Sequence, residues 1–228
     1  MMRAASAHKL ADLAADRARA LALTPVSRET AARLDRFVEL LLTWQGRINL
    51  VAPSTVSHLW TRHVADSLQL LALAPRARHW IDLGAGAGFP GLMIAIALAD
   101  EPGAAVDLVE SNTKKAAFLR EAQRLTGAPA RVHLQRIEDF AASFKGHAGV
   151  VTARAVAPLK SLLYQSFPLL GKSGATGLFP KGQRAELELE DAAALMKSAN
   201  MTATLVPSRT DPAGRIVVIR VEHGPTAP

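Results

Sequence analysis

A glycine-rich segment between Trp80 and Gly91 carries the residue types that point most clearly to chemistry. An apolar run ends in Asp82, glycines follow at positions 84, 86 and 88, and a second apolar run extends from Leu92 to Ala99. This order predicts a strand, a glycine-rich turn and a helix. Glycines let the chain turn sharply and let a ligand approach the main chain closely. The segment therefore predicts a cofactor site at the carboxyl end of the first strand of an open α/β sheet.

Two cofactors compete for this segment. The spacing Gly86-x-Gly88-x-x-Gly91 satisfies the dinucleotide fingerprint and favours NAD. Asp82, two residues ahead of Gly84, instead favours S-adenosylmethionine. That donor has no phosphate for a helix N-terminus, but its ammonium, sulfonium and ribose diol all favour oxygen acceptors. We expect S-adenosylmethionine as donor and S-adenosylhomocysteine as product, with NAD as the alternative.

The composition limits the classes of protein and of partner. The 228 residues suit one α/β domain with an extension, and the absence of cysteine excludes disulfides, thiolate metal sites and a cysteine nucleophile. No apolar run approaches the ~20 residues of a membrane helix, so we expect a cytoplasmic protein without membrane contact. The net charge of +7 and the pI near 10.2 favour a polyanion such as RNA as partner. We also expect a monomer without a metal.

Residues 1–75 are predicted to form a helical N-terminal cap. The expected helices are 4–23, a second one from an N-cap at Ser27 to Gly46, and a third from an N-cap at Ser54 to about Leu73. Apolar residues at helical spacing define one face of each of the last two helices.

Residues 76–222 alternate between strand and helix, which predicts a Rossmann-like α/β domain with a mostly parallel, seven-stranded sheet. The expected strands are 79–83, 106–110, 131–135, 149–153, 176–179, 201–206 and 215–221. The expected helices are 91–99, 113–125, 158–169 and 185–199. The connection 207–214 is too short to cross over the sheet, so the last strand pair is predicted to be antiparallel. Residues 223–228 are a tail.

The ends of the second and third strands offer contacts for the adenosine part of a cofactor. Glu110 ends the second strand, where a carboxylate can accept hydrogen bonds from both ribose hydroxyls. This contact suits NAD and S-adenosylmethionine equally. Ile137 and Glu138 follow the third strand, where an apolar side chain beside an acid can hold an adenine. Alternatively, Glu138 and Asp139 only favour the dipole at the start of a helix.

The end of the fourth strand, Val150 to Val156, bears on the type of reaction. Enzymes that methylate exocyclic amines commonly place an Asp/Asn-Pro-Pro-aromatic tetrapeptide here, and this tetrapeptide is absent. The absence of cysteine argues against methylation of a base carbon. A ring nitrogen with an in-plane lone pair, such as guanine N7, remains as acceptor, and it needs positioning without removal of a proton. We expect Arg154 to lie beside donor and acceptor, although it could instead pair only with Glu138 or Asp139.

Basic residues from several elements are expected to form a rim around this site. Lys181 follows the fifth strand, and Arg62, His63 and Arg184 lie in neighbouring segments. Cations in such a rim bind the phosphates of a nucleic acid. His63 alone is more often a structural histidine than a catalytic one.

Several motifs occur in an order that resembles a known family. They are Asn49-Leu50, Arg62-His63 with Asp66-Ser67-Leu68, Asp82 to Gly91, Glu110-Ser111-x-x-Lys114-Lys115, Arg154-Ala155 and Pro180-Lys181-Gly182. Over about residues 30–222 the chain resembles the glucose-inhibited division protein B family, the bacterial ribosomal RNA small subunit methyltransferase G family. Val51-Ala52-Pro53 departs from the Thr-Ala that the family often has after Asn-Leu.

This resemblance implies a class I S-adenosylmethionine-dependent methyltransferase fold with a helical cap, and N7 methylation of one guanine in 16S ribosomal RNA of the 30S subunit. It places the donor at Gly84, Phe89, Ile137, Glu138 and Arg154, with Glu110 as the ribose acid and Gly86 in the same turn. The alternatives are an NAD-dependent oxidoreductase and a catalytically idle protein that binds RNA or assists ribosome assembly. The sequence leaves open which nucleotide is the target, whether naked RNA or the assembled subunit is the substrate, and what residues 1–25 do.

Overall fold

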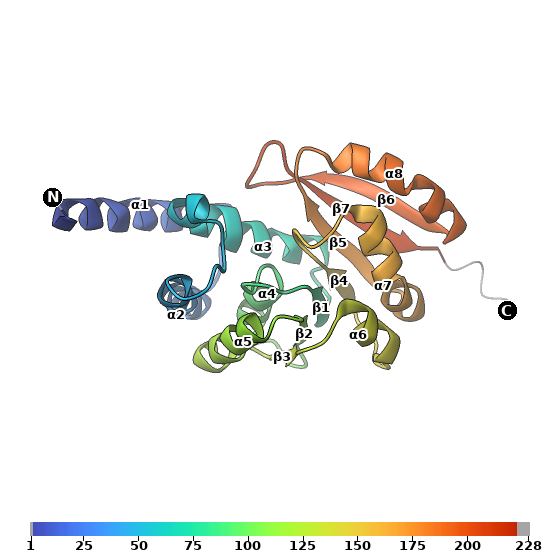
Figure 1. Cartoon of the computed structure of the whole chain (residues 1–228), viewed down its shortest axis with the longest axis horizontal. Helices are drawn as coiled ribbons and strands as arrows, with labels where there is room; N and C mark the ends of the chain where they lie inside the picture. The colour runs from blue at the N-terminus through green and yellow to red at the C-terminus, as the bar shows by residue number, and fades with distance from the viewer. Residues whose placement is uncertain (1, 223–228) are drawn as a thin grey trace.

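A computed structural model describes residues 2–222 and shows one seven-stranded sheet with helices around it (Figure 1). The predicted tail, 223–228, lies outside the described residues. The strand order is β3-β2-β1-β4-β5-β7-β6. Strands β1 to β5 are parallel, and β7 is antiparallel to both β5 and β6. The strands are β1 (His79–Leu83), β2 (Ala105–Val109), β3 (Ala130–His133), β4 (Val150–Thr152), β5 (Thr176–Lys181), β6 (Met201–Pro207) and β7 (Arg215–Val221). The predicted topology, including the antiparallel last pair, is confirmed.

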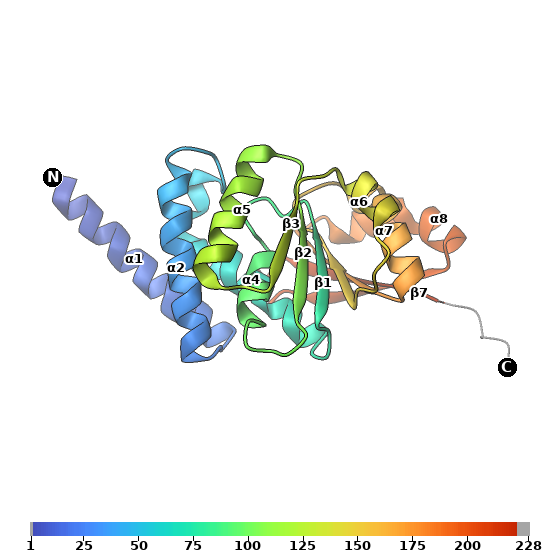
Figure 2. The same cartoon turned by 90° about the horizontal axis from the view of Figure 1, so that it is seen from below.

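Helices cover both faces of the sheet (Figure 2). On one face lie α4 (Gly91–Ala97) and α5 (Thr113–Thr126), and on the other lie α6 (Ile137–Ser143), α7 (Leu159–Ser173) and α8 (Ala185–Ser198). Adjacent strand residues point to opposite faces, so Trp80 packs with the first helix layer and Ile81 with the second. Both faces are apolar, as expected for a parallel sheet that is buried on both sides. Helix α6 was not among the four helices expected from the pattern, although a helix that starts near Glu138 was one of the two alternatives for this segment.

The cap packs directly on the sheet domain. Helix α1 (Met2–Leu23) is followed by α2 (Arg28–Gln45), which begins where the Ser27 hydroxyl accepts a hydrogen bond from the amide of Thr30, 3.1 Å away. The buried face of α2 contacts α4 and α5. The Phe37 ring lies 5.6 Å from that of Phe89 and 6.0 Å from that of Phe118. Cap and sheet therefore share one hydrophobic core, and the division at residue 75 remains a prediction.

The prediction of a helix from an N-cap at Ser54 to about Leu73 is only partly correct, because the segment is helical throughout but is not one α-helix, and its N-cap is Ala52. The segment is divided into a 3₁₀-helix η1 (Pro53–His58), a π-helical turn η2 (Trp60–Ala65), a short α3 (Asp66–Leu68) and a second 3₁₀-helix η3 (Gln69–Leu73). Asp16 on α1 supplies the reason, because its carboxylate accepts hydrogen bonds from the amides of Trp60 (2.8 Å) and Thr61 (3.1 Å). Those amides are not available for bonds within a regular helix. None of the helices within residues 2–222 is long and apolar enough to cross a membrane.

Candidate active site

The glycine-rich turn leads from the carboxyl end of β1 into α4 and forms a wall of two adjoining clefts. Gly84, Gly86 and Gly88 have φ values of +71°, +55° and +89°, which residues with a Cβ rarely adopt. A Cβ at Gly84 would lie 2.6 Å from Cγ2 of Val156, in the segment that follows β4. Position 84 therefore needs glycine for two reasons: its backbone has a positive φ, and a Cβ would overlap the Val156 side chain.

Asp82 lies beneath this turn and does not line either cleft. Its side chain is fully buried, and Oδ2 accepts a hydrogen bond from the amide of Gly91, 2.8 Å away. The other oxygen, Oδ1, has no hydrogen-bond partner among residues 2–222. Burial raises the pKa of Asp82 to about 7, against the opposing effects of the Gly91 amide and of Arg154. The carboxylate that favoured S-adenosylmethionine in the sequence therefore fixes the start of α4.

Glu110 directly follows β2, and its side chain is aimed at the glycine-rich turn. Its Oε2 accepts a hydrogen bond from the amide of Gly86 (2.9 Å), and Oε1 accepts one from the amide of Asn112 (2.7 Å). Only 8% of the residue is exposed. Each carboxylate oxygen has more than one lone pair, so the fixed carboxylate can still accept bonds from a ligand.

The smaller cleft has a volume of about 370 Å³ and brings together most of the predicted cofactor residues. These are Gly84, Gly86, Glu110, Ile137 and Glu138. Gln165 of α7 also lines this cleft, and its amide nitrogen donates to Oε1 of Glu138 over 2.6 Å. The amide oxygen of Gln165 is buried without a hydrogen-bond partner in the described part of the chain. The cleft thus combines an open main chain at Gly84 and Gly86, the fixed carboxylate of Glu110 and the unpaired amide oxygen of Gln165.

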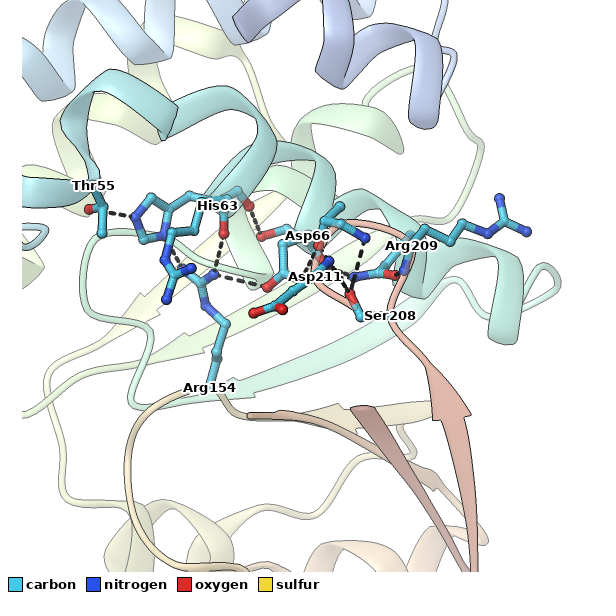
Figure 3. Close-up of polar contacts among 11 residues, drawn as sticks. Thr55, His63, Asp66, Arg154, Ser208, Arg209 and Asp211 are labelled. Atoms are coloured by element: carbon cyan, nitrogen blue, oxygen red, sulfur yellow. Dashed lines mark hydrogen bonds and ion pairs between the residues drawn. The ribbon is translucent and has the colours of Figure 1, made fainter. Parts of the chain in front are cut away.

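Arg154 lies just after β4, where the larger cleft adjoins the smaller one, and it bonds to the cap (Figure 3). Its Nη1 donates to Oδ2 of Asp66 (3.0 Å) and to the carbonyl of Arg62 (3.1 Å), and its Nη2 donates to Nδ1 of His63 (2.7 Å). The guanidinium also lies 5.3 Å from the centre of the Phe89 ring. Four residues therefore fix the position of the Arg154 guanidinium. The alternative pairing of Arg154 with Glu138 or Asp139 is not observed.

His63 belongs to the cap, and its ring lies between Arg154 and Thr55. Its ring stacks on Phe89 at 5.0 Å, and its Nε2 lies 3.0 Å from the hydroxyl of Thr55. Burial, and then the charges of Arg154 and Arg62, lower the pKa of His63 to about 3. The ring is therefore neutral at physiological pH, which lets Nδ1 accept the bond from Arg154 while Nε2–H donates to Thr55.

The loop between β6 and β7 joins the same network. Oδ1 of Asp66 accepts hydrogen bonds from the hydroxyl of Thr210 and from the amide nitrogen of Gln69, both at 2.8 Å. Gln69 in turn accepts a bond from the amide of Arg209 (2.8 Å). Cap, β4 segment and β6–β7 loop therefore meet at Asp66, as Figure 3 shows. Together they enclose the larger cleft, which has a volume of about 990 Å³.

The comparison with known proteins bears on this arrangement. A family model described as rRNA small subunit methyltransferase G matches residues 30–217. The chain belongs to this family. The Ribosomal RNA small subunit methyltransferase G of Bradyrhizobium sp. (strain BTAi1 / ATCC BAA-1182) is 58% identical over 207 residues, which cover 91% of each chain. The protein of that name from Methylobacterium sp. (strain 4-46) is 55% identical over 205 residues, 90% of this chain and 94% of the relative.

Solved structures support the fold. The O-methyltransferase TomG from Streptomyces achromogenes, in complex with S-adenosylmethionine, has a TM-score of 0.59 at 14% identity and covers 83% of this chain and 90% of its own. The O-methyltransferase from Bacillus cereus, in complex with S-adenosylhomocysteine, has a TM-score of 0.57 at 16% identity, with coverages of 81% and 90%. The family, the fold and the class of S-adenosylmethionine-dependent methyltransferase are thus confirmed, and the oxidoreductase alternative is not favoured.

The four predicted RNA-binding residues lie in different environments. Arg62 is exposed and lines the larger cleft, and the half-buried His63 described above also lines it. Lys181 also lines this cleft, but its ammonium is bonded to the carbonyl of Ala157 and to Oε2 of Glu188, both at 2.8 Å. Arg184 is exposed at the start of α8 and lines neither cleft. Their roles in RNA binding remain predictions, and only Arg62 combines exposure with a place in the cleft.

Three residues of the site were missed from the sequence. They are Gln165, Gln69 and Thr210, which lie in apolar or irregular stretches. Each contacts a partner that is 27 to 144 positions away in the sequence. No local spacing indicates such contacts. Among the side chains that the structure describes, no group of three or more His, Asp and Glu is placed to hold a metal ion. Monomeric state, cytoplasmic location and independence from metal remain predictions.

Proposed function

We propose that the chain transfers a methyl group from S-adenosylmethionine to N7 of one guanine in small-subunit ribosomal RNA. The observation that carries this proposal is the continuity of the two clefts, since Gly84, Gly86 and the segment 155–157 line both. A donor in the smaller cleft would therefore adjoin an acceptor in the larger one. The names of the family and of its relatives indicate the class of acceptor, ribosomal RNA of the small subunit.

The residues of the smaller cleft fit the donor. Gly84 and Gly86 leave the main chain open to a ligand, Glu110 is aimed where ribose hydroxyls would donate, and Ile137 with Glu138 can hold an adenine. S-adenosylmethionine supplies a methyl group on a sulfonium, which is electrophilic without further activation. The chain therefore has to bind and orient the donor rather than activate it.

The acceptor side supports a mechanism without a general base. Guanine N7 has an in-plane lone pair, so no proton has to be removed before the methyl group is transferred. The two titratable groups nearest Arg154 are also occupied, because both nitrogens of His63 and both oxygens of Asp66 take part in hydrogen bonds. Arg154, fixed at the junction of the clefts, contributes by positioning.

The test is transfer of labelled methyl from S-adenosylmethionine to small ribosomal subunits that lack the modification. We expect label in 7-methylguanosine at a single site, mapped by nuclease digestion and mass spectrometry. Arg154→Ala should slow transfer roughly 100-fold because orientation at the junction is lost. Arg124→Ala is a matched control, since Arg124 is exposed on α5 and lines neither cleft.

Other outcomes point to the alternatives. No transfer with intact S-adenosylhomocysteine binding would favour an idle RNA-binding protein. Tighter binding of NAD than of S-adenosylmethionine would favour an oxidoreductase. Label in a different nucleoside would retain the methyltransferase and reject guanine N7 as acceptor.

A further inference from the structure

Helix α1 lies outside the region that the family model matches, yet it is anchored to the candidate active site. Asp16 is only 2% exposed, and its carboxylate binds the amides of Trp60 and Thr61 and the Thr61 hydroxyl. These residues begin the π-helical turn that supplies Arg62 and His63. One turn of α1 therefore has a fixed position and rotation relative to the larger cleft.

Arg19 follows Asp16 by three positions, so both side chains lie on the same face of α1. Arg19 is exposed and lines the larger cleft. Its neighbour Arg17, on a different face, is instead paired with Asp35 (2.6 Å) and lies over the Trp60 ring. The anchor at Asp16 thus directs one arginine of α1 to the cleft and another to the body of the cap.

The cations that line the larger cleft fall into two groups. Arg154, Lys181 and Arg215 each have a carboxylate partner, at Asp66, Glu188 and Glu186. The side chains of Arg19, Arg62 and Lys115 have no hydrogen bond or ion pair with any residue that the structure describes. Their charges are therefore uncompensated. Lys115 belongs to α5, whereas Arg19 and Arg62, the two guanidinium groups, come from two elements that Asp16 holds together.

We propose that Arg19 and Arg62 form a phosphate-binding site for the RNA backbone next to the target nucleotide. The proposal rests on the function proposed above and assigns α1 a part in RNA binding. Guanidinium groups bind phosphate oxygens through paired hydrogen bonds. Two unpaired guanidinium groups beside one cleft fit a polyanion that enters the cleft with a base.

The test is equilibrium binding to unmodified small ribosomal subunits at fixed Mg²⁺ and varied KCl. Loss of one phosphate contact lowers the slope of log affinity against log salt by about 1. Arg19→Gln should therefore weaken binding about eight-fold at 0.1 M salt and about three-fold at 0.3 M. Arg19→Lys should restore most of the slope because it retains the charge. Binding of S-adenosylhomocysteine should be unchanged in both variants.

Arg124→Gln serves as the control, because it removes one exposed cation outside the cleft and should leave the slope unaltered. An Arg19→Gln protein that has the wild-type slope and affinity overturns this inference, whether or not Arg62→Gln has an effect. If wild-type protein itself shows no salt-dependent binding and no methyl transfer, the proposed function fails instead. Circular dichroism of each variant distinguishes loss of a contact from loss of folding.

Discussion

Gly84 determines the space that is open to a ligand at the end of β1. A side chain there would need an unfavourable φ of +71° and would overlap Val156. We expect Gly84→Ala to weaken S-adenosylhomocysteine binding at least about ten-fold, ~1.4 kcal/mol, as measured by isothermal titration calorimetry.

Gly103→Ala is the matched control for this change. Gly103 has a φ of +75°, but a Cβ there would meet no atom within 4 Å. It should lower the free energy of unfolding by about 1 kcal/mol without changing ligand affinity. Wild-type affinity in Gly84→Ala would show that Val156 moves aside and that the cradle does not depend on this glycine.

The pKa of His63, lowered to about 3 by burial and then by Arg154 and Arg62, makes a prediction for the pH dependence of methyl transfer. The ring is neutral throughout the range from about pH 5 to pH 9, so its ionisation should not affect the rate there. His63→Gln should be slower than wild type, because Arg154 is less well held, but its pH–rate profile should have the same shape. An inflection near pH ~6.5 that is present in wild type and absent in the variant would contradict this account.

At the scale of elements, one buried carboxylate connects three neighbouring strands. Asp107 on β2 accepts a hydrogen bond from His79 on β1 (2.6 Å) and another from His133 on β3 (2.8 Å). The bond to Asp107 raises the pKa of His79 despite burial. Burial alone would raise the pKa of Asp107, but the bonds from the two histidines outweigh it and lower that pKa.

These shifts predict how folding stability varies with pH. The contribution of His79 is complete below its unfolded-state pKa of ~6.5 and is lost as the pH rises through its higher folded-state pKa. The contribution of Asp107 is complete above its unfolded-state pKa of ~3.9 and is lost as the pH falls through its lower folded-state pKa. His79→Asn should therefore remove on the order of 1 kcal/mol of stability near pH 6 and little near pH 9. Urea unfolding at several pH values measures this, and an equal loss at both ends would refute it.

At the scale of the whole molecule, the shared core predicts that cap and sheet domain unfold together. Phe37 of α2 is fully buried and contacts Phe89 of the glycine-rich turn and Phe118 of α5. Phe37→Ala should lower the free energy of unfolding by about 3–5 kcal/mol. Unfolding curves from tryptophan fluorescence and from far-UV circular dichroism should coincide in both proteins. Trp44 and Trp60 report on the cap and Trp80 reports on β1, so two separate transitions would show independent domains.

The sequence predicted the parts of this molecule that follow local rules. Carboxyl ends of parallel strands meet at one edge, so Glu110, Ile137 and Glu138 could be placed beside Gly84 from their positions after strands. The third cap helix was predicted as one regular helix. It is irregular because the amides of Trp60 and Thr61 donate hydrogen bonds to Asp16, which is more than 40 residues distant. The contact of Asp66 with Thr210 spans 144 positions and has no local pattern. Such tertiary contacts decide the shape of the acceptor cleft, and they could not be predicted from spacing.

The position of β7 between β5 and β6 has a consequence during protein synthesis. Strand β6 pairs only with β7, so β6 and the loop that bears Thr210 cannot join the sheet before residues 215–221 have left the ribosome. Until then Asp66 and Arg154 lack the loop that closes the cleft. The smaller cleft is lined by residues up to Gln165, whereas the lining of the larger cleft extends to Ile216, so we expect the larger cleft to be complete only after β7 has joined the sheet.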